Sequence, residues 1–220
     1  MSIENITKSY GKKQVLKDIS LKVNSGECIA VLGSNGCGKS TLFNILYGIT
    51  RGNSGKFLCD GTDLLSNSKL REKTVAYVPQ NPLLIEELSA KDNLLMWYTA
   101  DEIKASLSSG VLNILGISGF LKTPVKKMSG GMKKRLSIAC AVSNKPKILL
   151  LDEPSSALDP MCKKTIYEYI ERFKKFGGTV ILSTHDLDEL AFCDAAFVIK
   201  DGLLSSFKKS DDIDGTVTHL

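Results

Sequence analysis

The fold is decided by one stretch of sequence, Gly33-Ser34-Asn35-Gly36-Cys37-Gly38-Lys39-Ser40, which satisfies the pattern G-x-x-x-x-G-K-[ST]. The apolar run that precedes it, residues 27–32, predicts a strand that is buried on both faces. Residues 41–47, which follow it, are apolar at helical spacing. A glycine-rich loop between a buried strand and a helix turns its backbone N–H groups inward around a polyphosphate. The sequence therefore predicts an α/β core that binds phosphate groups.

Two side chains of this loop have expected roles of their own. Lys39 is expected to reach the β- and γ-phosphates of a nucleotide, and the hydroxyl of Ser40 is expected to ligate Mg²⁺. The other residues, including Cys37, are expected to contribute their backbone only. The predicted nucleotide contacts of the loop and the first helical turn are Gly33, Ser34, Asn35, Gly36, Cys37, Gly38, Lys39, Ser40 and Thr41.

A second predicted part of the site follows another buried strand. Residues 148–151 are all apolar, and Asp152 and Glu153 come directly after them. This order places both carboxylates at the carboxyl edge of a core strand, where α/β sheets bind ligands. Asp152 suits a direct or water-mediated hold on Mg²⁺, and Glu153 suits polarising an attacking water beside the γ-phosphate.

A third segment, Met128-Ser129-Gly130-Gly131-Met132, precedes a predicted helix that carries basic residues in its first turns. A serine and two glycines at a helix start form another cluster of N–H groups suited to phosphate. Taken alone, the segment is more typical of an ordinary serine cap with flexible glycines. Its chemistry therefore depends on the rest of the chain.

The remaining sequence alternates strand and helix patterns. Residues 2–10 and 15–23 alternate apolar with polar side chains, which predicts an antiparallel pair. Apolar side chains recur every three or four residues in 81–127, which predicts a mostly helical insertion. Later segments predict helices at 130–143 and 160–176, strands at 148–151 and 179–183, and a closing hairpin around 201–202.

Strands that alternate with helices indicate a parallel sheet. The predicted fold class is α/β: a P-loop NTPase core with a mainly parallel sheet, an N-terminal antiparallel β subdomain and an inserted α-helical subdomain. We expect one domain over residues 1–220, with the core in about 1–80 and 128–220 and the helical subdomain in about 81–127.

Composition excludes several classes of protein. The 220 residues contain no apolar run long enough to span a bilayer, which takes about 20 residues. The net charge is +5, but the lysines come as scattered doublets such as Lys133-Lys134, which we interpret as solvated faces. Since no basic stripe is interleaved with aromatic residues, no nucleic-acid partner is expected. Six cysteines without a C-x-x-C pair predict reduced thiols.

Taken together, the motifs resemble those of the ATP-binding cassette family, and the resemblance covers nearly the whole chain. Ser129-Gly130-Gly131 resembles the family's signature motif, and Gln80, in Tyr77-Val78-Pro79-Gln80, resembles its glutamine loop. Ser156-Ala157-Leu158-Asp159 resembles the D-loop, and Ser183-Thr184-His185-Asp186 resembles the segment with the switch histidine. Six motifs in the family's order are far more specific than any one of them.

The resemblance implies ATP as the nucleotide and a head-to-tail pair of cassettes, in which each ATP lies between one subunit's phosphate loop and the other's signature helix. Four residues would then act in trans on the nucleotide of a second subunit: Ser129, Gly130, Gly131 and Asp159. That second subunit is either a copy of this chain or a paralogue.

The implied roles within one chain are of three kinds. Tyr10 would stack on adenine with Val15 nearby. Glu153, His185 and Gln80 would be catalytic. The implied Mg²⁺ ligands are Ser40, Gln80 and Asp152.

The chain departs from the family pattern at two positions. Met128 and Met132 stand where the signature usually has leucine and glutamine. Met128 preserves apolar packing. Met132 lacks an amide that could bond across an interface, so closure of the pair is expected to be weaker or the partner to differ.

The leading functional hypothesis is the ATP-hydrolysing subunit of a transporter whose membrane path belongs to a separate permease. The chain resembles exporter subunits, and it is expected in the cytoplasm, held on the cytoplasmic face of the membrane by that permease. The alternative is a soluble cassette ATPase, for example one in iron–sulfur cluster assembly. A GTPase is poorly supported, because Asn144-Lys145-Pro146-Lys147 lacks the aspartate of a base-reading N-K-x-D. The transported molecule and its direction stay open.

Overall fold

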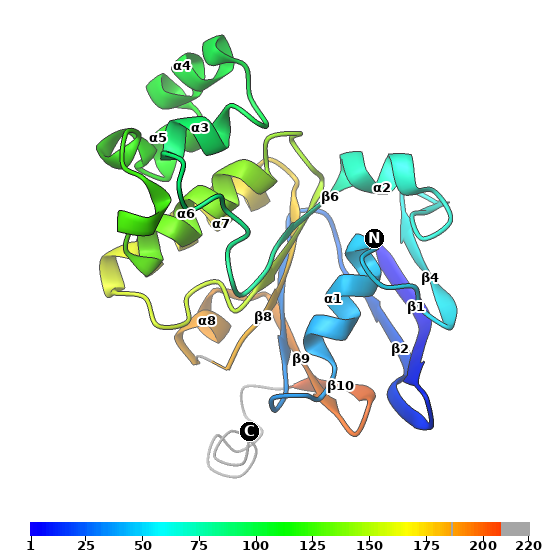
Figure 1. The fold of residues 1–220 in the computed structure, drawn as a ribbon. Helices are drawn as coiled ribbons and strands as arrows, with labels where there is room; N and C mark the ends of the chain where they lie inside the picture. The colour runs from blue at the N-terminus through cyan, green and yellow to red at the C-terminus, as the bar shows by residue number, and fades with distance from the viewer. Residues whose placement is uncertain (186, 208–220) are drawn as a thin grey trace.

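Two sheets organise the chain (Figure 1). The structure is a computed structural model that describes residues 1–185 and 187–207. The antiparallel sheet has the order β2-β1-β4-β5, and the larger sheet has the order β10-β9-β3-β8-β7-β6. The first comprises β1 (Ser2–Tyr10), β2 (Lys13–Lys22), β4 (Ser54–Cys59) and β5 (Thr62–Asp63). The second comprises β3 (Cys28–Leu32), β6 (Val75–Val78), β7 (Ile148–Asp152), β8 (Thr179–Ser183), β9 (Ala195–Lys200) and β10 (Leu203–Phe207).

The larger sheet is parallel except at one edge. Strands β6, β7, β8, β3 and β9 pair in parallel, and β10 returns antiparallel to β9 through the turn at Asp201 and Gly202. This mixed sheet, with an antiparallel sheet beside it, confirms the predicted α/β fold class.

The central strands are buried on both faces, and their side chains alternate between two cores. Ile29 and Val31 of β3 pack with α1 (Lys39–Tyr47) and the antiparallel sheet, whereas Ala30 and Leu32 pack with the helices on the other face. Those helices include α6 (Gly130–Ala141), α7 (Pro160–Lys175) and α8 (Leu187–Phe192). Helix α1 therefore lies between the two sheets, and α6 lies across the larger sheet from it (Figure 1).

The segment predicted as helical over 81–127 is less regular than expected. Its helices are short: α3 (Ala90–Leu94), α4 (Ala100–Ser109) and α5 (Val111–Ile114), followed by 3₁₀ turns at Ile117–Phe120 and Val125–Lys127. Residues 79–89 are not helical, because the first capping box of the segment is at Ser89 and Asp92, directly before α3. The boundaries proposed for a helical subdomain remain a prediction.

Helix α2 (Ser68–Thr74) was not predicted. Its sequence is mostly polar and offers no apolar stripe. The local signal for it is a cap, since the side chain of Asn67 accepts a hydrogen bond from the Leu70 N–H at 3.1 Å.

Candidate nucleotide site

The phosphate loop connects β3 to α1, and its glycines have backbone conformations that other residues rarely adopt. Gly33, Gly36 and Gly38 have φ values of 150°, 79° and 119°, in the left-handed region. A Cβ on Gly33 would lie 2.7 Å from the carbonyl oxygen of Ile199, and one on Gly38 would lie 2.8 Å from Cδ2 of Leu16. The loop therefore fits closely between β2, β9 and the start of α1.

Lys39 lies buried beneath this loop. Its Nζ donates hydrogen bonds to the carbonyl oxygens of Gly33 at 2.5 Å and Ser34 at 3.2 Å. The ammonium thus satisfies two carbonyl oxygens that face into the loop. The oxygens of a bound polyphosphate would compete with these carbonyls for the ammonium. Ser40 is exposed in the first turn of α1 and Thr41 is half-buried beside it, while Ser34, Asn35 and Gly36 form the exposed rim.

The residues predicted to contact adenine lie on the antiparallel sheet. Tyr10 ends β1 with 51% of its surface exposed, and the Nζ of Lys8 lies 4.7 Å from its ring centroid. Val15 is half-buried, and its side chain adjoins Gly38 of the phosphate loop. The aromatic ring is therefore available for stacking, with a cation on its ring.

Asp152 ends β7 and is buried between two hydroxyl groups. Its Oδ1 accepts from Ser183 Oγ at 2.5 Å, and its Oδ2 accepts from the Tyr77 phenol at 3.3 Å. Burial, followed by the charge of Asp152, raises the pKa of Tyr77, so the phenol stays protonated and can donate. Sequence analysis missed both supporting hydroxyls. The signal for them is register, because Ser183 pairs with Asp152 across the parallel strands.

Glu153 is the next residue, and its backbone bends sharply. Its φ of 45° is a left-handed conformation that is strained for a glutamate, and its N–H donates to Ser183 Oγ at 3.1 Å. The bend directs the carboxylate toward Gln80, whose Nε2 donates to Oε2 at 2.9 Å, and toward His185, whose Nδ1 is 3.5 Å from Oε1. Three residues predicted as catalytic therefore meet at one carboxylate, although they lie far apart in the sequence.

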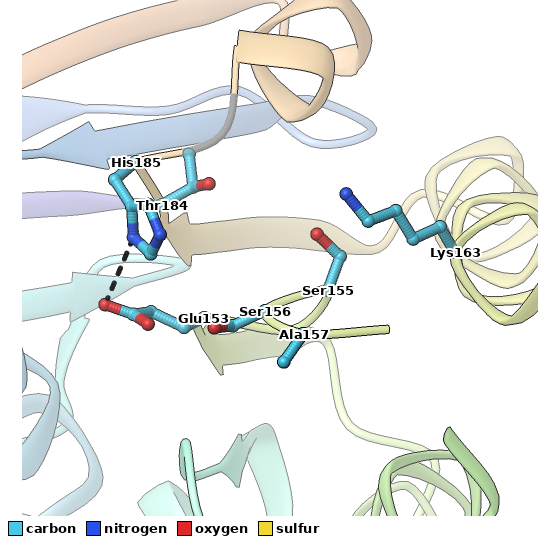
Figure 2. A pocket seen from close by; sticks show the side chains of 7 residues that line it. All are labelled: Glu153, Ser155, Ser156, Ala157, Lys163, Thr184 and His185. Carbon is cyan, nitrogen blue, oxygen red and sulfur yellow. Dashed lines mark ion pairs between the residues drawn. The ribbon is translucent and has the colours of Figure 1, made fainter. Parts of the chain in front are cut away.

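A small cavity opens beside this carboxylate. Figure 2 shows Glu153 and His185 at one side of it, with the D-loop residues below and Lys163 of α7 opposite. Its volume is ≈ 150 Å³, which is room for a few water molecules. Its lining residues are Glu153, Ser155, Ser156, Ala157, Lys163, Thr184 and His185. Asp186, the last residue of the predicted histidine motif, lies outside the described residues.

The residues predicted to act in trans form a separate group. Ser129 caps α6 by accepting from the Met132 N–H at 3.2 Å, Gly130 is exposed, and Gly131 is buried against Cys162. Asp159 caps α7, and hydrogen bonds from Cys162 lower the pKa of its carboxyl. Within residues 1–185 and 187–207, no hydrogen bond or ion pair joins either cap to the phosphate loop.

Comparison with known proteins assigns the family. The family model described as "ABC transporter" matches residues 16–156. The chain belongs to the ABC transporter family. It is 38% identical over 190 residues to a lantibiotic transport ATP-binding protein of Streptococcus pyogenes, across 86% of this chain and 82% of that protein. It is also 32% identical over 219 residues to a linearmycin resistance ATP-binding protein of Bacillus subtilis, across 97% of this chain and 70% of that one.

Solved structures of ABC transporter cassettes share the fold. An ATP-binding subunit of an ABC transporter superposes with a TM-score of 0.84 at 27% identity, over 96% of this chain and 90% of that one. An ATP-binding cassette solved as a dimer in a post-hydrolysis state, with ADP and phosphate bound, superposes with a TM-score of 0.83 at 27% identity, over 94% of this chain and 98% of that one. This chain is an ATP-binding cassette and an ATPase.

One prediction about the signature helix of this ABC cassette is wrong. Lys134 belongs to a doublet interpreted as a solvated face, yet only 4% of its surface is exposed. Its Nζ donates to the carbonyl oxygens of Pro79 at 3.1 Å and Gln80 at 2.9 Å, and burial lowers its pKa to about 8. Helical spacing could have found it, because the buried Gly131 and Ile138 lie one turn to either side on the same face.

Oxygen ligands at the site fit Mg²⁺. The hydroxyl of Ser40, the carboxylate of Asp152 and the amide of Gln80 are hard donors of the kind Mg²⁺ prefers. No group of three or more His, Cys, Asp or Glu side chains that could hold a metal occurs in the part of the chain that the structure describes. A sparse set of protein ligands is typical of Mg²⁺ that is held largely by substrate phosphates.

Proposed function

We propose that this cassette powers export through a separate membrane-spanning permease. The support is the set of relatives, which are named for lantibiotic transport, linearmycin resistance and Nod factor export. No described helix has the length and apolar character needed to cross a bilayer. These relatives favour transport over the soluble alternative, and the position that follows is the cytoplasmic face of the membrane.

The observation that supports the catalytic assignment best is the meeting of Gln80, Glu153 and His185. We assign Glu153 as the group that orients and partly deprotonates the attacking water. The Gln80 amide fixes one carboxylate oxygen, and the His185 ring lies beside the other. Glu153 is buried, and its carboxylate borders the small cavity, which has room for the attacking water.

We also assign the contacts to the phosphates, the adenine and the metal. Lys39 and the N–H groups of residues 33–41 hold the ATP phosphates, and Tyr10 with Val15 contacts the adenine. Ser40, Gln80 and Asp152 would hold Mg²⁺, which would offset negative charge on the phosphate oxygens. Ser183 and Tyr77 keep the Asp152 carboxylate in place through their hydroxyl groups.

A second subunit completes each nucleotide site. Ser129 and Gly130 form an exposed helix start, and Asp159 lies beside Gly131. A head-to-tail pair brings this helix start to the partner's nucleotide, so ATP joins the subunits and its hydrolysis releases them. The dimeric cassette with ADP and phosphate supports this arrangement.

The permease is expected to contact an apolar surface beside the glutamine loop. Leu83 and Ile85 are exposed there, Leu83 by 85%, and Leu95, Met96 and Trp97 are exposed directly after α3. Buried Asn93 supports the surface, since its side chain accepts from the Ile85 N–H at 2.9 Å and donates to the Ile85 carbonyl at 3.2 Å. Several exposed apolar side chains close together in the sequence are typical of a protein interface.

The experiment that tests the catalytic assignment is Glu153→Gln. The amide keeps the size of the side chain but cannot accept a proton, so turnover should fall by about 10²–10⁴-fold while ATP binding is kept. The trapped ATP should also shift the variant from monomer to dimer in size-exclusion chromatography. The matched control is Glu87→Gln, at an exposed glutamate in the non-helical segment 79–89, which should behave as wild type. Hydrolysis at the wild-type rate by Glu153→Gln would refute the assignment.

A further inference from the structure

The signature helix and the glutamine loop are joined by a buried lysine. Lys134 lies one turn into α6, and its ammonium donates to the main-chain carbonyl oxygens of Pro79 and Gln80. Both acceptors are carbonyl oxygens in the non-helical segment after β6. A buried loop carbonyl without a donor loses free energy comparable to a lost hydrogen bond, so these contacts define the path of the loop.

The same loop residue takes part in the catalytic geometry. The main chain of Gln80 accepts from Lys134, while its side chain donates to Glu153 at 2.9 Å. Gln80 itself is exposed, and packing does not fix it. The reach of its amide to the carboxylate therefore depends on where the backbone is held. Three acidic groups face the ammonium and stabilise its charge: Asp152 at the end of β7, Glu153 directly after it, and Glu189 of α8.

We propose that Lys134 is a positioning residue that fixes the glutamine loop to the signature helix, so that the amide of Gln80 stays on the Glu153 carboxylate. The inference rests on the proposed catalytic role of Glu153. It adds a second role for α6. The helix that presents Ser129–Gly131 to a partner also fixes the position of the Gln80 amide on the Glu153 carboxylate of its own chain. One side chain, Lys134, then connects the signature helix start to the Gln80–Glu153 pair of the same subunit.

The neighbouring lysine provides a matched control. Lys133 donates to Glu86 Oε1 at 2.8 Å from a more exposed position on the same helix. Exposed ion pairs contribute little to stability, so Lys133→Met should leave the kcat of ATP hydrolysis within about twofold of wild type. Lys134→Met makes the same chemical change and keeps the apolar stem, but it removes the donor to the loop.

Steady-state ATP hydrolysis by the full chain tests the proposal. Lys134→Met should lower kcat by about tenfold or more, as losses of supporting hydrogen bonds do, while KM for ATP stays within about twofold. Lys134→Arg, which keeps the donors, should recover most of kcat. Thermal melting of each variant checks folding, and Lys134→Gln, a shorter donor, is the alternative if Lys134→Met does not fold.

A double-mutant cycle distinguishes positioning from general support. In a Gln80→Ala background, Lys134→Met should reduce kcat by less than about threefold further, because the group it positions is already absent. Equal losses in both backgrounds, or an unchanged kcat in Lys134→Met, would overturn the proposal. A wild-type chain without hydrolysis, or a Glu153→Gln variant with full hydrolysis, would instead contradict the proposed function itself.

Discussion

Two glycine loops at helix starts lie on opposite faces of one sheet, and they use glycine for different reasons. In the phosphate loop, Gly33 and Gly38 have left-handed backbones and leave no room for a Cβ. In the signature motif, Gly130 and Gly131 have ordinary helical backbones within α6. Gly131 is needed for close contact with Cys162 of α7, whereas a Cβ on Gly130 would have only Leu158 nearby, at 3.8 Å.

The difference between the two sets of glycines concerns the groups that each loop contacts. The phosphate loop is complete within its chain, because Lys39 already lies beneath it and donates to its carbonyls. In the signature loop, Ser129 caps α6 by accepting from the Met132 N–H, and Gly130 is exposed. The proposed pairing accounts for the missing side chain at Gly130, which neither the backbone nor the local packing requires, by close approach of the partner's nucleotide.

The largest predicted effect comes from damaging the two loops separately and then mixing the products. Lys39→Ala should abolish tight ATP binding, because it removes the charge that faces the phosphates. Ser129→Arg should keep ATP binding by the monomer and abolish turnover, because a bulky cation blocks the partner's approach. Binding of a fluorescent ATP analogue and steady-state hydrolysis measure the two losses.

Mixing these two inactive variants should restore hydrolysis. A mixed pair holds one site with both loops intact, so activity should return to at most about a quarter of the wild-type value if pairing is random and the sites are independent. Mixing each variant with more of itself is the control. Failure of every mixture to recover, with both proteins folded, would mean that the loops do not belong to a shared site.

A smaller effect is expected from Gly38→Ala. Its φ of 119° is strained for alanine, and the added Cβ would press on Leu16 and Val15. We expect the free energy of unfolding to fall by about 1–3 kcal/mol, together with a loss of ATP affinity. Urea denaturation followed by circular dichroism measures the first effect. Gly61→Ala, at a left-handed glycine with open space around it, is the control for backbone strain alone.

The sequence predicts the phosphate loop better than it predicts the surroundings of the signature helix. The phosphate loop could be predicted because its pattern combines glycine spacing with a preceding apolar strand and a following helix. The burial of Lys134 could not be predicted from charge, since lysine doublets are usually solvated and only the three-dimensional path of residues 79–89 brings carbonyls to it. Within that segment, Asn93 of α3 holds Ile85 through two hydrogen bonds.

The meeting of Gln80, Glu153 and His185 could be expected only through family resemblance. Nothing in the spacing of these residues indicates their distances, which depend on parallel pairing of β6, β7 and β8 and on the left-handed backbone at Glu153. Sheet register also brings Ser183 to Asp152, a contact that composition does not predict.

The smallest predicted effect compares the two signature glycines directly. A Cβ on Gly131 would overlap the Sγ of Cys162, so Gly131→Ala should lower the free energy of unfolding by about 1–3 kcal/mol, and adding Cys162→Ala should recover part of the loss. Gly130→Ala should leave that free energy unchanged or raise it slightly, because alanine favours helix.

The two glycine variants separate packing from recognition when dimer formation is measured as well. In the Glu153→Gln background, Gly130→Ala should weaken the ATP-dependent dimer although the monomer is fully stable, since its new methyl group lies on the exposed helix start that the partner's nucleotide approaches. Dimerisation equal to that of the parent would mean that the open space at Gly130 is incidental. Partner contact would then have to rest on Ser129 and the helix N–H groups alone.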